Sequence, residues 1–153
     1  MDDNREYEWG TRKKVLGMKV YGFSKNVKGV IRKEIVGMLK GREEILFAYI
    51  YGSFLEGRFR DVDVAIYLDS ERDVRYALNL EGELEEGVGV PVDIRILNSA
   101  PPSFRFRVIS QGILLFSRDE ERRSNFESLT MAEYHDFKFY REMYRRDALG
   151  IKV

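Results

Sequence analysis

The chain of 153 residues has no cysteine, which excludes disulfide bonds, thiolate metal sites and a catalytic cysteine. Its only histidine, His135, has no partner at metal-ligand spacing and is interpreted as structural or exposed. No apolar run approaches the roughly 20 residues that span a bilayer, and the polar, acidic N-terminus is unlike a secretory signal. These absences favour a cytoplasmic protein without a membrane segment.

A net charge is also lacking. The 26 basic and 26 acidic residues cancel, so bulk charge gives no attraction for a nucleic acid, and direct nucleic-acid binding is not expected. Any site for an anion must therefore be local. With 44% hydrophobic and 34% charged residues, the composition is that of a folded chain and not of a disordered one.

The hydrophobic pattern predicts one α/β domain over residues 1–153. Residues 1–25 are interpreted as an extended N-terminal arm, residues 28–116 as the core, and residues 119–147 as a long C-terminal helix capped by Ser117 or Asp119. Strands are predicted at residues 45–51, 62–68, 90–97 and 113–116, and further helices at residues 27–39, 72–85 and 101–111.

Two of the predicted helices carry apolar faces of different kinds. In the helix over residues 72–85, the side chains predicted to face the core are those of Val74, Ala77, Leu78 and Leu80. The C-terminal helix carries rings at three-to-four spacing, which are more often core than anything else. The alternative is that part of this stripe covers a partner or a second copy of the chain. Its members are Phe126, Leu129, Tyr134, Phe137, Tyr140 and Tyr144.

Two aspartates open the predicted strand over residues 62–68. Because side chains alternate across a strand, Asp61 and Asp63 share one face, and Val62 and Val64 share the other. Two carboxylates placed in this way repel each other unless a cation lies between them. Mg²⁺ is the usual oxygen-bound cation in such a place. The alternative is a pair of solvated acids at an exposed strand start.

A third aspartate, Asp93, points off the apolar face of the predicted strand over residues 90–97. If this strand and the strand over residues 62–68 are neighbours in matched register, three carboxylates converge, as in a two-metal phosphoryl-transfer site. Asp93 would then bind the second metal and accept a proton from the attacking hydroxyl. The alternative is a surface acid paired with Arg95.

The buried strand over residues 45–51 ends abruptly at Gly52-Ser53. A glycine lets a phosphate approach the backbone, and the serine hydroxyl with the following N–H groups can hold phosphate oxygens. Arg58 and Arg60 in the connecting loop would neutralise the remaining charge. The alternatives are an ordinary tight turn and solvated loop arginines.

Taken together, these residues resemble the nucleotidyltransferase superfamily that includes DNA polymerase beta, kanamycin nucleotidyltransferase and the small stand-alone MNT proteins. The matching pattern is Gly52-Ser53, a spacer of seven residues, Asp61-Val62-Asp63 and then Asp93 on a later strand. The chain departs from the family pattern at Arg60, where many members have serine, and at Glu56-Gly57-Arg58, where many have Arg-Gly.

The resemblance implies a mixed β-sheet packed with helices and a Mg²⁺-dependent enzyme that uses ATP. By size the chain is similar to the minimal MNT antitoxins, which act beside a helical HEPN ribonuclease toxin. For these the resemblance implies transfer of AMP from ATP to a tyrosine of the toxin. A nucleotidyltransferase fold that only binds and masks the toxin, or only binds a nucleotide, is the alternative.

Overall fold

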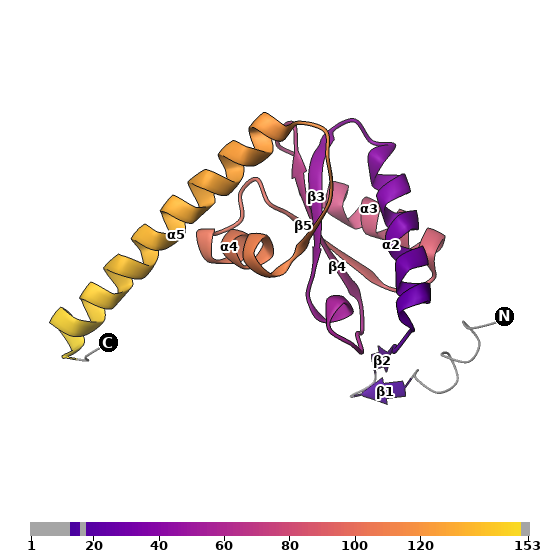
Figure 1. The fold of residues 1–153 in the computed structure, drawn as a ribbon, viewed down its shortest axis with the longest axis horizontal. Helices are drawn as coiled ribbons and strands as arrows, with labels where there is room; N and C mark the ends of the chain where they lie inside the picture. Colours follow the sequence, from indigo (N-terminus) through magenta and orange to yellow (C-terminus); the bar gives the residue numbers. More distant parts are fainter. Residues whose placement is uncertain (1–12, 16–17, 151–153) are drawn as a thin grey trace.

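A four-stranded mixed sheet forms the centre of the computed structural model, which describes residues 13–15 and 18–150 (Figure 1). The strand order is β5-β4-β3-β6, with β4 and β5 parallel and the other pairs antiparallel. The strands are β3 (Ile45–Tyr51), β4 (Val62–Leu68), β5 (Val92–Ile96) and β6 (Ile113–Ser117). The predicted order of helices and strands and the mixed sheet are both confirmed.

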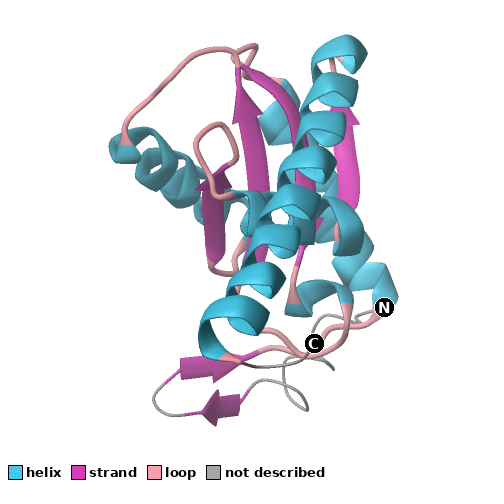
Figure 2. Cartoon of the chain, turned by 90° about the vertical axis from the view of Figure 1, so that its left-hand side faces the viewer, coloured by secondary structure: helices cyan, strands magenta, loops and turns pink. Residues whose placement is uncertain are grey.

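Two cores lie on the two faces of this sheet. On one face, α2 (Lys25–Lys40) and α3 (Val74–Val88) pack against the valines and isoleucines of β4 and β5. On the other, α4 (Pro102–Gln111) and the start of α5 (Glu120–Leu149) cover the rings of β3 (Figures 1 and 2). Because β3 is buried on both faces along its whole length, its sequence is an almost unbroken apolar run.

Side-chain caps set where the helices begin. The hydroxyl of Ser24 accepts a hydrogen bond from the Val27 amide at 3.2 Å, so α2 begins slightly earlier than predicted. Asp73 and Asp119 cap α3 and α5 in the same manner. The C-terminal helix is therefore capped by Asp119, one of the two predicted candidates.

The predicted inward face of α3 is partly wrong. Ala77, Leu80 and Leu84 are buried, whereas Val74 is 68% and Leu78 56% exposed. Leu78 lies about 100° around the helix from Ala77, outside the stripe that meets the sheet. The helix also continues beyond its predicted end at residue 85, through Val88.

Most of the aromatic stripe of α5 is not core. Phe126 is buried, and Tyr134 stacks on Phe106 with ring centroids 4.0 Å apart. Phe137, Tyr140 and Tyr144 lie further along the same helix face and are exposed. The reason is length, since 30 residues of helix extend about 45 Å and outrun the sheet (Figure 1). Among the described residues, no helix is both long and apolar enough to cross a membrane.

The described part of the N-terminal arm is extended, as predicted. It forms a short hairpin of β1 (Lys13–Val15) and β2 (Met18–Val20). Tyr21 follows and pairs with Phe59 through two backbone hydrogen bonds of 2.7 and 2.8 Å. The rest of the arm, residues 1–12 and 16–17, lies outside the described residues. The arm thus reaches the loop that connects β3 to β4.

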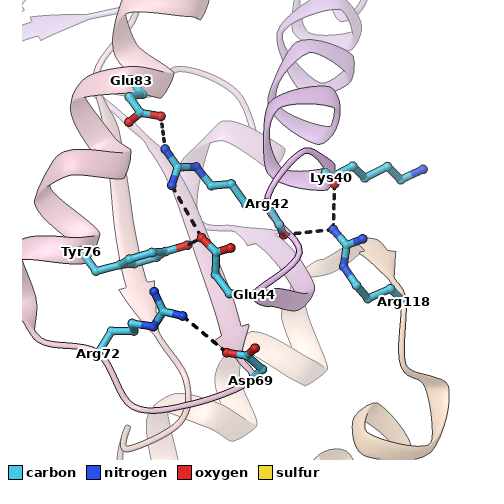
Figure 3. Close-up of polar contacts among 8 residues, drawn as sticks. All are labelled: Lys40, Arg42, Glu44, Asp69, Arg72, Tyr76, Glu83 and Arg118. Carbon is cyan, nitrogen blue, oxygen red and sulfur yellow. Dashed lines mark hydrogen bonds and ion pairs between the residues drawn. The ribbon is translucent and has the colours of Figure 1, made fainter.

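Polar contacts cluster near the end of β4 that lies away from the two opening aspartates (Figure 3). Arg42 forms ion pairs with Glu83 and, at 3.6 Å, with Glu44. The hydroxyl of Tyr76 donates a hydrogen bond of 2.7 Å to Glu44. That hydrogen bond, then a hydrogen bond from the backbone and then the charge of Arg42, hold the pKa of Glu44 below its usual value. These contacts join the loop before β3 to α3.

Candidate active site

Three polar side chains form a row across the sheet, which we call the acid row: Tyr51 on β3, Asp63 on β4 and Asp93 on β5. Asp63 is the register partner of Tyr51 on one side and of Asp93 on the other. Register partners point to the same face of a sheet, here the face covered by α4. Asp61 lies one residue before β4. The structure thus brings together the two strand-borne aspartates that the sequence pattern singled out.

The carboxylates of this site repel one another. The pKa of Asp63 is raised to about 6, first by burial and then by the charges of Asp61 and Asp93. Burial and the charges of Asp63 and Asp93 also raise the pKa of Tyr51, so its hydroxyl keeps its proton at neutral pH. Negative charge is therefore concentrated here and is stabilised by any cation that enters.

Gly52 brings the Gly-Ser bend directly against Asp63. Its φ of +85° and ψ of −161° lie in a region that is essentially restricted to glycine. A Cβ on Gly52 would lie 2.3 Å from Oδ2 of Asp63, so the Asp63 carboxylate would have to move to admit any side chain there. Ser53 follows with an exposed side chain and opens a short 3₁₀ helix, η1 (Ser53–Leu55). The bend and the acid row are therefore in contact.

The loop over residues 52–60 is fastened at two points. Lys28 of α2 donates hydrogen bonds of 2.6 Å to the backbone carbonyls of Phe54 and Gly57. Its ammonium group also lies 5.0 Å from the centre of the Phe54 ring, and burial lowers its pKa. Phe59 packs edge-on against Phe54 and is paired with Tyr21. Sequence reasoning missed Lys28, because a lysine on an amphipathic helix ordinarily marks the solvated face.

The two arginines that were predicted to neutralise phosphate both lie in this loop. Arg58 and Arg60 have exposed side chains, and their role at a phosphate stays a prediction.

Two other arginines, Arg95 and Arg107, lie near the acids, and sequence reasoning assigned neither a site role. Nε of Arg95 is 3.2 Å from Oδ2 of Asp93, so the pairing left open as the alternative for Asp93 is present. The guanidinium carbon of Arg107 lies 5.7 Å from the centre of the Tyr51 ring. Arg107 and Arg95 both oppose the rise in the pKa of Asp63. The available signals were strand alternation for Arg95 and, for Arg107, its position one helical turn after Phe104.

The donor set fits a hard divalent cation in its chemistry, since carboxylate oxygens are the ligands that Mg²⁺ prefers. The raised pKa of Asp63 fits a site that gains from added positive charge. In the part of the chain that the structure describes, however, no three acidic or histidine side chains are grouped so that they could hold a metal ion. Binding by Asp61, Asp63 and Asp93 together therefore requires their side chains to move closer to one another.

Comparisons with known proteins identify the fold and the family. The chain resembles one chain of a structure of the tri-AMPylated Shewanella oneidensis HEPN toxin in complex with MNT antitoxin, at 20% identity and a TM-score of 0.66. The likeness covers 80% of this chain and 98% of the other chain. It resembles a crystal structure of the toxin–antitoxin MntA–HepT at 20% identity, a TM-score of 0.65 and coverages of 79% and 98%. It also resembles a crystal structure of the toxin–antitoxin with AMP-PNP, at 21% identity and a TM-score of 0.66. That likeness covers 77% of this chain and 98% of the other chain. These likenesses show the fold.

Among curated proteins, no sequence matches the chain significantly. The family described as polymerase beta, nucleotidyltransferase, matches residues 33–121. This match covers more than half of the chain and runs from the second half of α2 to the first residues of α5, including the Gly-Ser bend and all three aspartates. The chain belongs to the polymerase beta nucleotidyltransferase family.

Proposed function

We propose that this chain is a Mg²⁺-dependent nucleotidyltransferase that moves AMP from ATP onto a hydroxyl group. The observation that carries the proposal is the contact between the Gly52-Ser53 bend and a row of aspartates from two neighbouring strands. A phosphate-binding bend and a cation-binding acid cluster in contact are what transfer of a nucleotidyl group requires.

The residues take separate roles in this proposal. Asp61, Asp63 and Asp93 hold divalent metal, which when bound neutralises charge on the reacting phosphates. Ser53, with Arg58 and Arg60, holds the phosphate chain. Asp93 accepts the proton of the acceptor hydroxyl. The hydroxyl oxygen then bonds to the α-phosphorus of ATP, the bond from that phosphorus to the bridging oxygen breaks, and pyrophosphate leaves.

The proposed acceptor is a tyrosine of a HEPN-type toxin, to which this chain would be the antitoxin. The support is that similar structures are toxin–antitoxin complexes, one of them with an AMPylated toxin. The uncovered rings of α5 support a protein partner further, since exposed apolar surface of this kind marks interaction sites. Phe137, Tyr140 and Tyr144 would form that surface.

A second candidate is an antitoxin that binds its toxin without chemistry. Two observations favour it: Asp93 is paired with Arg95, and the loop at residues 56–60 departs from the family pattern. Co-expression with a toxin distinguishes the two candidates. A chain with Asp61→Asn and Asp63→Asn that still neutralises the toxin acts by masking, and one that no longer does so acts by transfer.

Transfer itself is tested with α-³²P-labelled ATP and a HEPN acceptor. We expect Asp61→Asn or Asp63→Asn to lower transfer at least about a thousandfold, because most of the catalysis is charge neutralisation by bound metal. Asp69→Asn is the matched control, since Asp69 lies just past the other end of β4 and pairs with Arg72 at 3.7 Å (Figure 3). Wild-type transfer rates in both site variants would end the proposal.

A further inference from the structure

We propose that Glu81 and Glu85 of α3 are positioning residues for Asp93, because they hold the backbone on both sides of it and so set where Asp93 stands in the acid row. The inference deepens the proposed nucleotidyl transfer and rests on it, since Asp93 is the proposed proton acceptor. Neither glutamate would touch the nucleotide or the metal, so both act through the strand that carries Asp93.

Two hydrogen bonds cross from the helix to the strand. The Val92 amide donates to Oε2 of Glu85 at 3.0 Å, and the Ile94 amide donates to Oε2 of Glu81 at 2.8 Å. Asp93 lies between these two amides and is the register partner of an aspartate on β4. The backbone around Asp93 is therefore held by β4 on one side and by α3 on the other.

Helix and strand geometry explain why two glutamates meet two amides. Residues four apart in a helix are about 6 Å apart along its axis and lie on one face. Alternate residues of a strand are about 6.6–6.8 Å apart, which is nearly the same spacing. Since Glu85 bonds to Val92 and Glu81 to Ile94, the helix and the strand run in opposite directions. Gly89, with a φ of +78°, ends the helix before the chain turns back.

The strand β5 needs this support because it is the outermost strand on its side of the sheet. A strand in that place has N–H groups that no neighbouring strand binds. Pro91 has no N–H group, and its carbonyl accepts a hydrogen bond of 2.9 Å from the Val62 amide. Asp63 stands on β4, between two neighbouring strands. Of the two strand-borne aspartates, Asp93 is thus the one whose place depends on a helix.

The glutamates should affect the chemical step more than the binding of ATP. A displacement of about 1 Å at a reacting group can lower a rate about a hundredfold. The Gly52-Ser53 bend follows β3, on the other side of β4 from β5. Loss of the two hydrogen bonds would therefore lower kcat through Asp93 and leave the KM for ATP close to that of the wild type.

Amide hydrogen exchange of the full chain, followed by NMR, tests the contacts without any reaction. We expect Glu85→Ala to speed exchange of the Val92 amide at least about tenfold, and Glu81→Ala to do the same for Ile94. Glu81→Gln and Glu85→Gln keep an acceptor oxygen and should retain protection. Glu86→Ala, at an exposed position of the same helix, is the control. Unchanged protection in both alanine variants would overturn the proposal.

Binding of Mn²⁺ alone, followed by electron paramagnetic resonance, tests the effect on the site. The variant with both Glu81→Ala and Glu85→Ala should bind Mn²⁺ about tenfold less tightly, as loss of groups that orient metal ligands does. The matched double glutamine variant should bind like the wild type, because the hydrogen bonds and not the charges position Asp93. Urea unfolding verifies that each variant is folded, and the single alanine variants replace the double one if it is not. Wild-type Mn²⁺ affinity in folded alanine variants would overturn the positioning role.

Transfer from labelled ATP separates this role from the proposed function. In the double alanine variant we expect kcat to fall about thirtyfold with an unchanged KM for ATP, and the glutamine variant to restore kcat. If exchange and Mn²⁺ binding change as expected but the wild type labels no acceptor, the transferase proposal fails and the placement of Asp93 by α3 stands. If the wild type transfers AMP and the alanine variant keeps its kcat, the positioning role fails and the transferase stands.

Discussion

Carboxylates at the two ends of β4 have opposite electrostatic surroundings. At the end shown in Figure 3, Glu44 accepts a hydrogen bond from Tyr76 and pairs with Arg42, and its pKa is lowered. At the other end, Asp63 lies against two further carboxylates, and its pKa is raised to about 6. A carboxylate that serves the fold is surrounded by its partners. The Asp63 carboxylate instead lies near other carboxylates, at a cost to stability that a bound cation would offset.

The largest expected effect comes from the bend. Gly52→Ala should lower nucleotidyl transfer more than a hundredfold and destabilise the chain by about 2–4 kcal/mol, because the backbone is strained for alanine and the new methyl group overlaps Asp63. Urea unfolding and labelled-ATP transfer measure the two effects. Gly82→Ala, in α3 with nothing near its Cβ, is the control and should stabilise by about 0.5–1 kcal/mol. Unchanged activity in Gly52→Ala would break the link between bend and acid row.

The next largest effects are changes in stability when one carboxylate at each end of β4 is neutralised. Without metal at pH 8, Asp63→Asn should stabilise the chain by about 1–2 kcal/mol, because it removes a carboxylate whose ionised form is disfavoured in the fold. This is less than the full pKa shift would give, since water screens the half-exposed group. Glu44→Gln should destabilise by about 1 kcal/mol, because Arg42 and Tyr76 lose a charged partner.

The pH dependence of these two variants has opposite signs. The pKa of Asp63 is raised in the fold, so the protonated carboxyl stabilises the fold only at low pH, and this stability is lost as the pH rises from about 4 to 6. The gain from Asp63→Asn should therefore vanish below pH 4. The pKa of Glu44 is lowered, so its contribution should fade on acidification. Urea unfolding between pH 3.5 and 8 measures both, and the same sign for both variants would contradict the comparison.

A smaller effect is expected when the hydrogen bonds from Lys28 to the loop over residues 52–60 are removed. Lys28→Met keeps the length that packs on Phe54 but removes the two hydrogen bonds to backbone carbonyls. We expect transfer to fall about tenfold, mostly through a higher KM for ATP, with less than about 1.5 kcal/mol lost in stability. Lys33→Met, on an exposed part of the same helix, is the control. An unchanged KM would show that the bend keeps its shape without Lys28.

The smallest effect on the free protein is expected at the uncovered rings of α5. Tyr140→Glu should change the free energy of unfolding by less than about 0.5 kcal/mol, since the ring is exposed. It should nevertheless weaken binding to a HEPN partner at least about tenfold, as measured by biolayer interferometry. His135→Glu, which lies on a different face of the helix, is the control. Equal binding by both variants would remove this face from the partner surface.

Sequence patterns predicted the order of the elements and the four strands, because each depends on local spacing. The meeting of Asp63 and Asp93 was predicted only on the condition that their strands are neighbours in matched register, and the structure shows that they are. Alternation within a strand decides which residues share a face, and this brought Asp63 and Asp93 to the same side. Which residues of a helix face the core was harder to predict. Val74 and Leu78 are apolar yet exposed, because the width of the stripe that meets the sheet depends on how α3 packs.

The amino-acid sequence by itself determined the kind of fold and three acids at the ends of strands, since short-range periodicity and side-chain chemistry are enough for both. Only the tertiary structure decided that Lys28 holds the loop, that Arg107 reaches Tyr51 from another helix, and that the far half of α5 lies uncovered. Each of these depends on where one element ends relative to another, which is a distance in space between residues far apart in the chain.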